Sequence, residues 1–392
     1  MSADLAPRAR ATVQDLAPLL LSLSRELHAH PELSLEETRS AALLQIELQK
    51  EGFEVETGLA GLPTSFRARR TGRAPGPRVA FLAEYDALPG IGHACGHNLI
   101  AAAAMGAGLT LGRLADDLPG EILVIGTPAE ETLGGKCLMV KEGCFRDLDV
   151  ALMIHPGSEW RVEAESLACI SLEVVFTGRE AHAVAWPERG INALDALIQL
   201  FVAVETLRKR MGRDVFIPGV IAEGGVRPNI VPARAVGRFS LRAPTSPHRD
   251  RVRGEFEKTV HGIAAAMGCG VHVRPTDEPY DDMVTNQTLA GLFRGHLRAE
   301  GVSTVEGPRT NKGSLDMGNV SRALPSLHPF IAICDRDVPS HSEAFAAAAV
   351  SERAERALLT AVRALALTGL DVLTRPEVLA AAREEFGRLA RA

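Results

Sequence analysis

Apolar residues near the start of the chain recur at helical spacing. Between Val13 and Leu27 they occupy every third or fourth position, which is typical of an amphipathic helix. Strand-like apolar runs follow at 78–85, 121–127 and 149–154, and helical stretches separate them. This alternation predicts an α/β fold, in which helices cover a mostly parallel sheet.

The pattern changes after residue 165. From 166 to 280 the predicted order is strand, helix, strand, strand, helix, strand, which matches the split ferredoxin-like unit. The α/β pattern then resumes and ends in a long, alanine-rich helix at 343–368. We therefore predict one domain formed by 1–165 and 281–392, and a second domain, 166–280, inserted into it.

The composition of the 392 residues is that of an ordinary folded protein. Hydrophobic residues make up 46% and charged residues 23%, which excludes a disordered tail or a fibre. The 43 basic and 49 acidic residues give a net charge of -6, which argues against nucleic acid or an anionic membrane as the main partner. A small-molecule partner is favoured.

No segment is expected to cross a membrane or to direct secretion. The longest apolar stretch without charges, 98–112, is shorter than the about 20 residues that a spanning helix needs. The first residues carry Asp4, Arg8 and Arg10 with no apolar core behind them, unlike a secretory signal. Six cysteines lack regular spacing, so no disulfides are expected. We therefore expect a cytoplasmic protein.

Polar side chains that suit a metal site follow four of the predicted strands. In open α/β sheets, ligands gather beyond the carboxyl ends of the strands. One such residue alone is usually structural, but their recurrence at one edge of one sheet indicates a metal centre. A thiolate, imidazoles and a carboxylate suit zinc, with manganese, cobalt or nickel as substitutes. The residues at these strand ends are Asp86, His93, Cys95, His97, Glu130, Glu131, His155 and His341.

Two of these residues, Glu130 and Glu131, are adjacent. Successive side chains of an extended segment point in opposite directions, so one carboxylate can bind metal while the other faces water and substrate. A metal-bound water loses a proton near neutral pH, and a nearby carboxylate can accept this proton and return it to a leaving amine. The pair therefore predicts hydrolytic chemistry.

A series of motifs resembles the M20 metallopeptidase family. Within that family the chain is most similar to the amidohydrolase branch, and there to the aminoacylase-1-like dipeptidase group. The matches run in order from about Leu27 to the final helix. The motifs are LAEYDALPGIGHACGHN, GTPAEE, TGREAHA, GGVRPNIVP, GSLDMGNVS and SHSEAF.

The resemblance implies two divalent metal ions per subunit, with Glu130 as the general base. Asp86 falls on an acidic residue that orients a ligand in the family, and a simple turn residue at a strand end is the alternative interpretation. His93 is either a supporting or a structural residue. The implied metal ligands are Cys95, which can bridge the two ions, His97, Glu131, His155 and His341.

The inserted domain resembles the lid and dimerisation domain of the family. His182 falls on a histidine that stabilises the oxyanion in relatives, in its own subunit or in the partner. Asn229 and Arg242 are candidates for binding the free carboxylate of the substrate, because arginine presents a bidentate fork to that group. A solvent-facing arginine is the alternative interpretation of Arg242. The resemblance also implies a homodimer formed through this domain.

Two departures from the family pattern bear on the site. Glu84 occupies the position at which the wider family carries a histidine, as expected for a branch with a cysteine-centred site. Related dipeptidases read GSTDFGNVS where this chain reads GSLDMGNVS, so that Leu315 replaces a hydroxyl and Met317 an aromatic ring. If this stretch lines the pocket, the preference shifts toward a more apolar substrate group.

The sequence thus predicts a metal-dependent hydrolase that cleaves a C–N amide bond in a small dipeptide or an N-acyl amino acid. In this interpretation a metal-bound hydroxide attacks the carbonyl with Glu130 as the general base. Hydrolysis of another amine–carbon bond, in an aryl amide or by aromatic deamination, is one alternative. A catalytically silent binding protein and a protein with a purely structural metal are the others.

Overall fold

The computed structural model describes residues 4–304, 306 and 312–389. The chain divides into two compact units. The first unit is formed mainly by the residues up to Glu165 and from Met283 onward, and the second by Ser166–Asp282 together with Lys312–Leu315.

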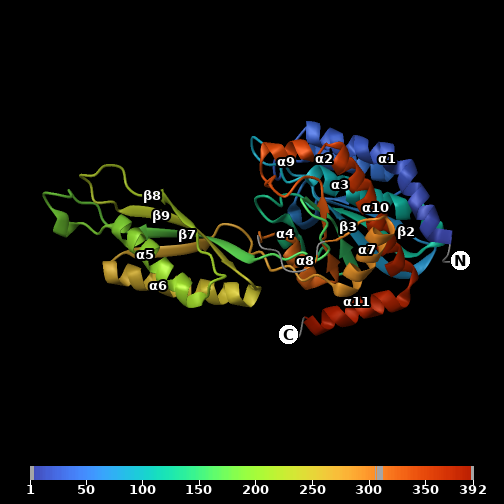
Figure 1. Ribbon diagram of the computed structural model, residues 1–392. Helices are drawn as coiled ribbons and strands as arrows, with labels where there is room; N and C mark the ends of the chain where they lie inside the picture. The colour runs from blue at the N-terminus through green and yellow to red at the C-terminus, as the bar shows by residue number, and fades with distance from the viewer. Residues whose placement is uncertain (1–3, 305, 307–311, 390–392) are drawn as a thin grey trace. The chain divides into compact units, whose positions relative to one another are not determined.

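The first unit contains a six-stranded mixed sheet in the order β1-β2-β4-β3-β5-β11 (Figure 1). The central pairs β3/β4, β3/β5 and β5/β11 are parallel, whereas β1/β2 and β2/β4 are antiparallel. The predicted α/β class is therefore confirmed, with an antiparallel edge that the hydrophobic pattern did not indicate. The strands are β1 (Glu54–Thr57), β2 (Phe66–Thr71), β3 (Ala74–Ala83), β4 (Pro119–Gly126), β5 (Val150–Leu152) and β11 (Ser326–Leu327).

Three long helices, α1 (Leu5–Ala29), α3 (His97–Gly112) and α10 (Glu352–Thr374), pack against one another beside this sheet (Figure 1). Every residue of α3 is buried. Gly108 allows α3 to contact the sheet closely, because a Cβ at this position would lie 2.2 Å from Val124 Cγ2. This packing fixes the N-terminus of α3, which begins at His97, against the carboxyl ends of the parallel strands.

The long helix predicted at 343–368 is two helices, α9 (Glu343–Ala348) and α10. The prediction was wrong because Ser351 interrupts the alanine-rich run: its hydroxyl accepts a hydrogen bond from the amide of Ala354 and starts α10. Among the described residues, α10 is the one helix long and apolar enough to cross a membrane, and 72% of its most apolar window is buried inside the protein.

Shorter elements complete the first unit. Strands β6 (His155–Gly157) and β12 (Phe330–Ala332) form a separate parallel pair. The remaining α-helices are α2 (Thr38–Lys50), α4 (Gly135–Lys141), α7 (Gln287–Ala299), α8 (Met317–Ala323) and α11 (Pro376–Leu389).

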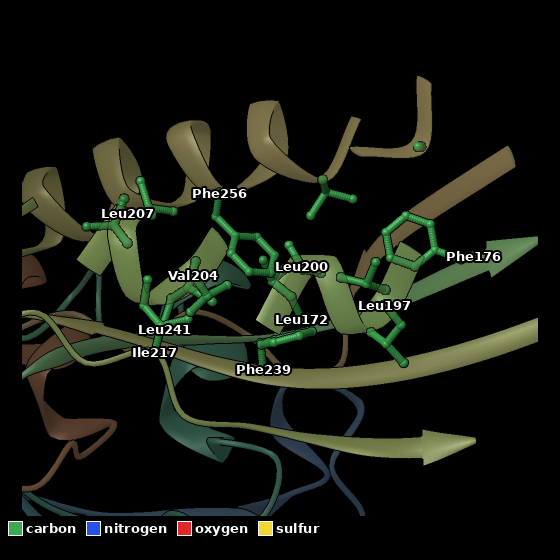
Figure 2. Packing of buried hydrophobic residues seen from close by; sticks show 14 of the residues in the cluster. Leu172, Phe176, Leu197, Leu200, Val204, Leu207, Ile217, Phe239, Leu241 and Phe256 are labelled. Atoms are coloured by element: carbon green, nitrogen blue, oxygen red, sulfur yellow. The ribbon is translucent and has the colours of Figure 1, made fainter. Parts of the chain in front are cut away.

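The second unit has the element order β-α-β-β-α-β and an antiparallel sheet in the order β10-β7-β9-β8. Its core lies between this sheet and the two helices, where Phe256, Leu200 and Phe239 gather (Figure 2). The rings of Phe239 and Phe256 meet edge to face at 5.2 Å. The elements are β7 (Ala168–Thr177), α5 (Ala193–Met211), β8 (Gly219–Glu223), β9 (Arg234–Ala243), α6 (Ser246–Met267) and β10 (Gly270–Pro275).

Candidate metal centre

The five predicted metal ligands come from four separate segments of the first unit. Cys95 lies in the loop after β3, and His97 is the first residue of α3. Glu131 lies in the turn between β4 and α4, His155 begins β6, and His341 precedes α9. The ends of the elements therefore deliver these side chains, as the topology of an open α/β sheet leads one to expect.

The potential ligand atoms converge in three groups, each with all its atoms within 4.8 Å of one another. Cys95, His97 and Glu131 each belong to two of the groups, so the three groups overlap in one centre. The distance from Cys95 Sγ to His155 Nε2 is 3.5 Å, and His341 Nε2 lies 3.6 Å from Glu131 Oε1. The groups are Cys95, His97 and His155; Cys95, Glu131 and His341; and His97, Glu130 and Glu131.

Buried polar atoms without partners show that this cage fits a cation. His97 Nε2 and Glu131 Oε1 are 3.8 Å apart, and neither forms a hydrogen bond. Buried polar atoms are nearly always paired, so two unpaired atoms that face each other need a further group between them. The donor set of thiol, imidazole and carboxylate matches a divalent transition metal.

Asp86 contacts two of the predicted ligands at once. Its Oδ1 lies 3.0 Å from His97 Nδ1, and its Oδ2 accepts hydrogen bonds from the amide of Glu131 at 3.0 Å and from Ser34 Oγ at 2.8 Å. Burial raises the pKa of Asp86, but the charge of His97 and these hydrogen bonds outweigh burial and lower it to about 2. Because Nδ1 is occupied by Asp86, the remaining ring nitrogen of His97 is directed to the metal side.

The backbone around the cage is shaped by two residues with positive φ. Gly96, between Cys95 and His97, has φ +79°, and a Cβ there would lie 2.7 Å from Pro156 Cγ. His341 has φ +61°, and its amide donates to the carbonyl of Ala94 at 2.9 Å. Glycine is thus required between two ligands, and the Ala94 carbonyl ties His341 to the Cys95 loop.

Burial favours the neutral forms of two of the predicted ligands. It raises the pKa of the Cys95 thiol to about 12 and lowers the pKa of His155 to about 3. A neutral imidazole is ready to bind metal, whereas the thiol must first lose its proton. Metal binding is therefore coupled to proton release from Cys95.

A buried ion network beside the cage was missed by the sequence analysis. Lys136 has no exposed side-chain surface, and its ammonium donates to Glu84 and, at 2.7 Å, to Asp316 Oδ1. The second oxygen of Glu84 lies 3.5 Å from His97 Nε2. Burial, together with the charges of Asp316 and Glu84, raises the pKa of Glu130 well above its usual range. Lys136 and Asp316 are 180 positions apart, so no local pattern signals their contact.

The other predicted site residues have different surroundings. His93 is buried, and its ring stacks on His28 at 6.2 Å, outside the three ligand groups. His182 and Asn229 lie on neighbouring loops of the second unit, where the amide of Ala183 donates to the carbonyl of Asn229 at 3.0 Å. Arg242 lies in β9, and its Nε is 3.3 Å from Ser240 Oγ.

Comparison with known proteins places the chain in a family. The sequence model of peptidase family M20/M25/M40 matches residues 80–367, so the chain belongs to this family. It is 36% identical to the Xaa-Arg dipeptidase of Mus musculus, with 97% of this chain and 91% of the relative aligned. The resemblance found in the sequence is confirmed, and the protein is a metal-dependent amide hydrolase.

A further relative and a solved structure are also similar to this chain. One of the p-aminobenzoyl-glutamate hydrolase subunits of Escherichia coli is 31% identical over 68% of this chain and 59% of its own length. The crystal structure of a dinuclear metal-binding M20-family peptidase from Bacillus subtilis matches with a TM-score of 0.71 at 22% identity, covering 92% of this chain and 99% of that one. At this identity the match shows the shared fold.

The shared position of Cys95 predicts the effect of its removal. Cys95→Ala is expected to lower metal affinity by more than the about 10–100-fold typical for losing a residue that only supports a ligand. Elemental analysis after dialysis should show depleted metal in this variant and in His341→Ala. Cys334→Ala, which removes a buried cysteine outside the three groups, is the matched control and should keep its metal. Full occupancy in Cys95→Ala would refute the ligand assignment.

Proposed function

We propose that this protein hydrolyses the amide bond of a small dipeptide or an N-acyl amino acid with two divalent metal ions per subunit. Zinc or manganese is the proposed metal, with cobalt or nickel as alternatives. The observation that carries the proposal is the placement of Cys95 in two ligand groups, with Glu130 in the third. A donor shared between two sets of ligands can bridge a pair of neighbouring cations.

The chemistry divides between the cations and Glu130. Divalent ions at this site polarise the scissile carbonyl and acidify water. Glu130 shares a group with His97 and Glu131, so its carboxylate lies within reach of a water molecule at the cage. It accepts a proton from the attacking water and returns this proton to the departing amine nitrogen.

His182 is proposed to stabilise the oxyanion. Its Nδ1 accepts hydrogen bonds from the amides of Val184 and Ala185, at 3.3 and 3.1 Å, so the ring proton of neutral His182 resides on Nε2. An imidazole held in this tautomer is a donor suited to a developing oxyanion. Asn229 and Arg242 are proposed to bind the substrate carboxylate, and the second unit to act as a lid.

These roles predict two variants that lose turnover and keep metal. Glu130→Gln removes the base and is expected to lower kcat by about 10²–10⁴-fold. His182→Ala removes one oxyanion donor and is expected to lower kcat by about 10²–10³-fold. Steady-state kinetics and elemental analysis of the same preparations separate catalysis from metal loss. Normal turnover in either variant would remove that residue from the mechanism.

The substrate class is tested by a panel of amides with the metal-loaded enzyme. Dipeptides ending in arginine come first, because the relative aligned over 97% of the chain is an Xaa-Arg dipeptidase, and dipeptides with apolar groups test the effect of Leu315 and Met317. N-acyl amino acids follow. We expect the highest kcat/KM on a dipeptide. Aryl amides represent the second candidate function, which the similarity to a p-aminobenzoyl-glutamate hydrolase favours. Cleavage of aryl amides alone would replace the first proposal by the second.

A homodimer through the second unit is also proposed. Strand β8 is an edge of the sheet, and its Val220 and Ile221 are 61% and 48% exposed. Helix α5 exposes Ile198 and Val202 in the same unit. An exposed apolar edge strand is a liability unless another chain pairs with it, and a second copy can do so about a two-fold axis.

Val220→Glu is therefore expected to convert the dimer into a monomer. A charge on each copy of the edge strand would face its counterpart across the two-fold axis. Light scattering coupled to size-exclusion chromatography gives the mass directly. Ile46→Glu, an exposed apolar position on α2 of the first unit, is the control and should leave the mass unchanged. A wild-type protein that elutes as a monomer would contradict the proposal.

A further inference from the structure

A carboxylate outside the metal cage reaches the turn that carries the proposed base. Glu37 is fully buried at the start of α2, 92 positions from Ala129. Its Oε1 accepts a hydrogen bond from the amide of Ala129 at 2.9 Å, and its Oε2 accepts one from Thr64 Oγ1 at 2.8 Å. Glu37 thus links the first turn of α2 to the residue that directly precedes Glu130.

Capping of its own helix does not account for the burial of Glu37. A side chain at the N-cap position ordinarily accepts a hydrogen bond from the second or third amide of its helix. Glu37 makes no such bond, and those amides, of Arg39 and Ser40, donate instead to Glu32 at 3.0 and 2.7 Å. The helix is therefore capped from Glu32. Burial raises the pKa of Glu37, which shows that burying this carboxylate is energetically unfavourable. Capping of α2 does not explain why the carboxylate is nevertheless buried.

The turn that Glu37 contacts includes an unfavourable backbone conformation. Ala129 has φ +60°, in the left-handed region that residues with a Cβ rarely adopt. Its carbonyl accepts hydrogen bonds from Gly134 and Gly135 at 2.9 and 3.2 Å, which closes the turn on itself. A Cβ on Gly135 would lie 1.8 Å from the carbonyl oxygen of Pro128, so the turn requires glycine at this position. Ala129 is therefore bound through both its amide, by Glu37, and its carbonyl, by the amides of Gly134 and Gly135.

Glu130 stands between two anchored amides. The amide before it, of Ala129, is held by Glu37 at 2.9 Å, and the amide after it, of Glu131, is held by Asp86 at 3.0 Å. Asp86 also contacts His97, so it aligns metal ligands. Glu37 contacts none of the predicted ligands in these hydrogen bonds, and the residue that it binds directly precedes Glu130.

We propose that Glu37 is a positioning residue for catalysis, which holds Glu130 in line with the metal cage through the backbone of Ala129. The inference rests on the proposed role of Glu130 as the base. A displacement of about 1 Å in a reacting group can cost about 100-fold in rate, so a lost anchor next to the base is expected to appear in kcat.

Three variants separate positioning from simple stability. Glu37→Ala leaves the buried Ala129 amide without an acceptor. Glu37→Gln keeps a carbonyl oxygen for this amide and is the conservative rescue. Glu32→Ala is the matched control, because it removes a carboxylate that caps the same helix but makes no hydrogen bond to the 128–135 turn. Each variant is compared with wild type by thermal unfolding, metal content, kinetics and hydrogen exchange.

Glu37→Ala is expected to lower kcat by about 10–100-fold with little change in KM and with metal retained. Hydrogen exchange measured by mass spectrometry should be faster in a peptide that covers 128–135. Glu37→Gln should recover most of kcat and of the protection. Glu32→Ala should lower the midpoint of thermal unfolding and speed exchange at the start of α2, while kcat and exchange in the turn stay as in wild type.

Wild-type kcat in Glu37→Ala, or unchanged exchange in the turn, would overturn the inference. An equal loss of kcat in Glu32→Ala would also overturn it, because Glu37 would then act only through stability. A metal-loaded wild type that cleaves no amide of the panel would instead overturn the proposed function, and the role of Glu130 with it. The amide-cleaving activity of the wild-type protein therefore distinguishes failure of the proposed function from failure of the inference about Glu37.

Discussion

The buried carboxylate of Asp86 is the contact on which the centre depends. Asp86 follows β3, and it binds the ring of His97 from α3, the amide of Glu131 from the turn after β4, and the hydroxyl of Ser34. The two carboxylate oxygens of Asp86 therefore connect three segments that are far apart in the sequence. Because both oxygens are used, the remaining nitrogen of His97 and the side chain of Glu131 face each other across the cage.

Several acidic side chains lie beside the cage, and the positive charge of Lys136 partly compensates them. Glu84 and Asp316 contact Lys136, all three side chains are buried, and the charge of Glu130 also raises the pKa of Lys136. A buried ion pair contributes little net stability, but the loss of one member is costly because it leaves an uncompensated charge. The network thus ties the shape of the site to the integrity of α4 and α8, the helices next to Lys136 and Asp316.

Anchoring by carboxylates recurs around the turn after β4. Asp86 holds the amide of Glu131, and Glu37 holds the amide of Ala129. Ala129 has a left-handed φ of +60°, which is unfavourable for alanine, and the amides of Ala129 and Glu131 both donate to buried carboxylates. Glu130 therefore lies in a turn whose flanking amides are both bound by buried carboxylates, outside any helix or strand.

The sequence by itself determined the α/β class and the set of residues that meet in the cage. Strand periodicity locates the carboxyl ends, and chemistry-bearing residues directly after those ends, such as Cys95, Glu131 and His155, must lie at one edge of the sheet. The antiparallel edge formed by β1 and β2, the Lys136 network and the contact of Glu37 with Ala129 were decided only by the tertiary structure. The physical reason is that such contacts join residues many positions apart in the sequence. Local periodicity and motif spacing do not indicate which distant residues will pair.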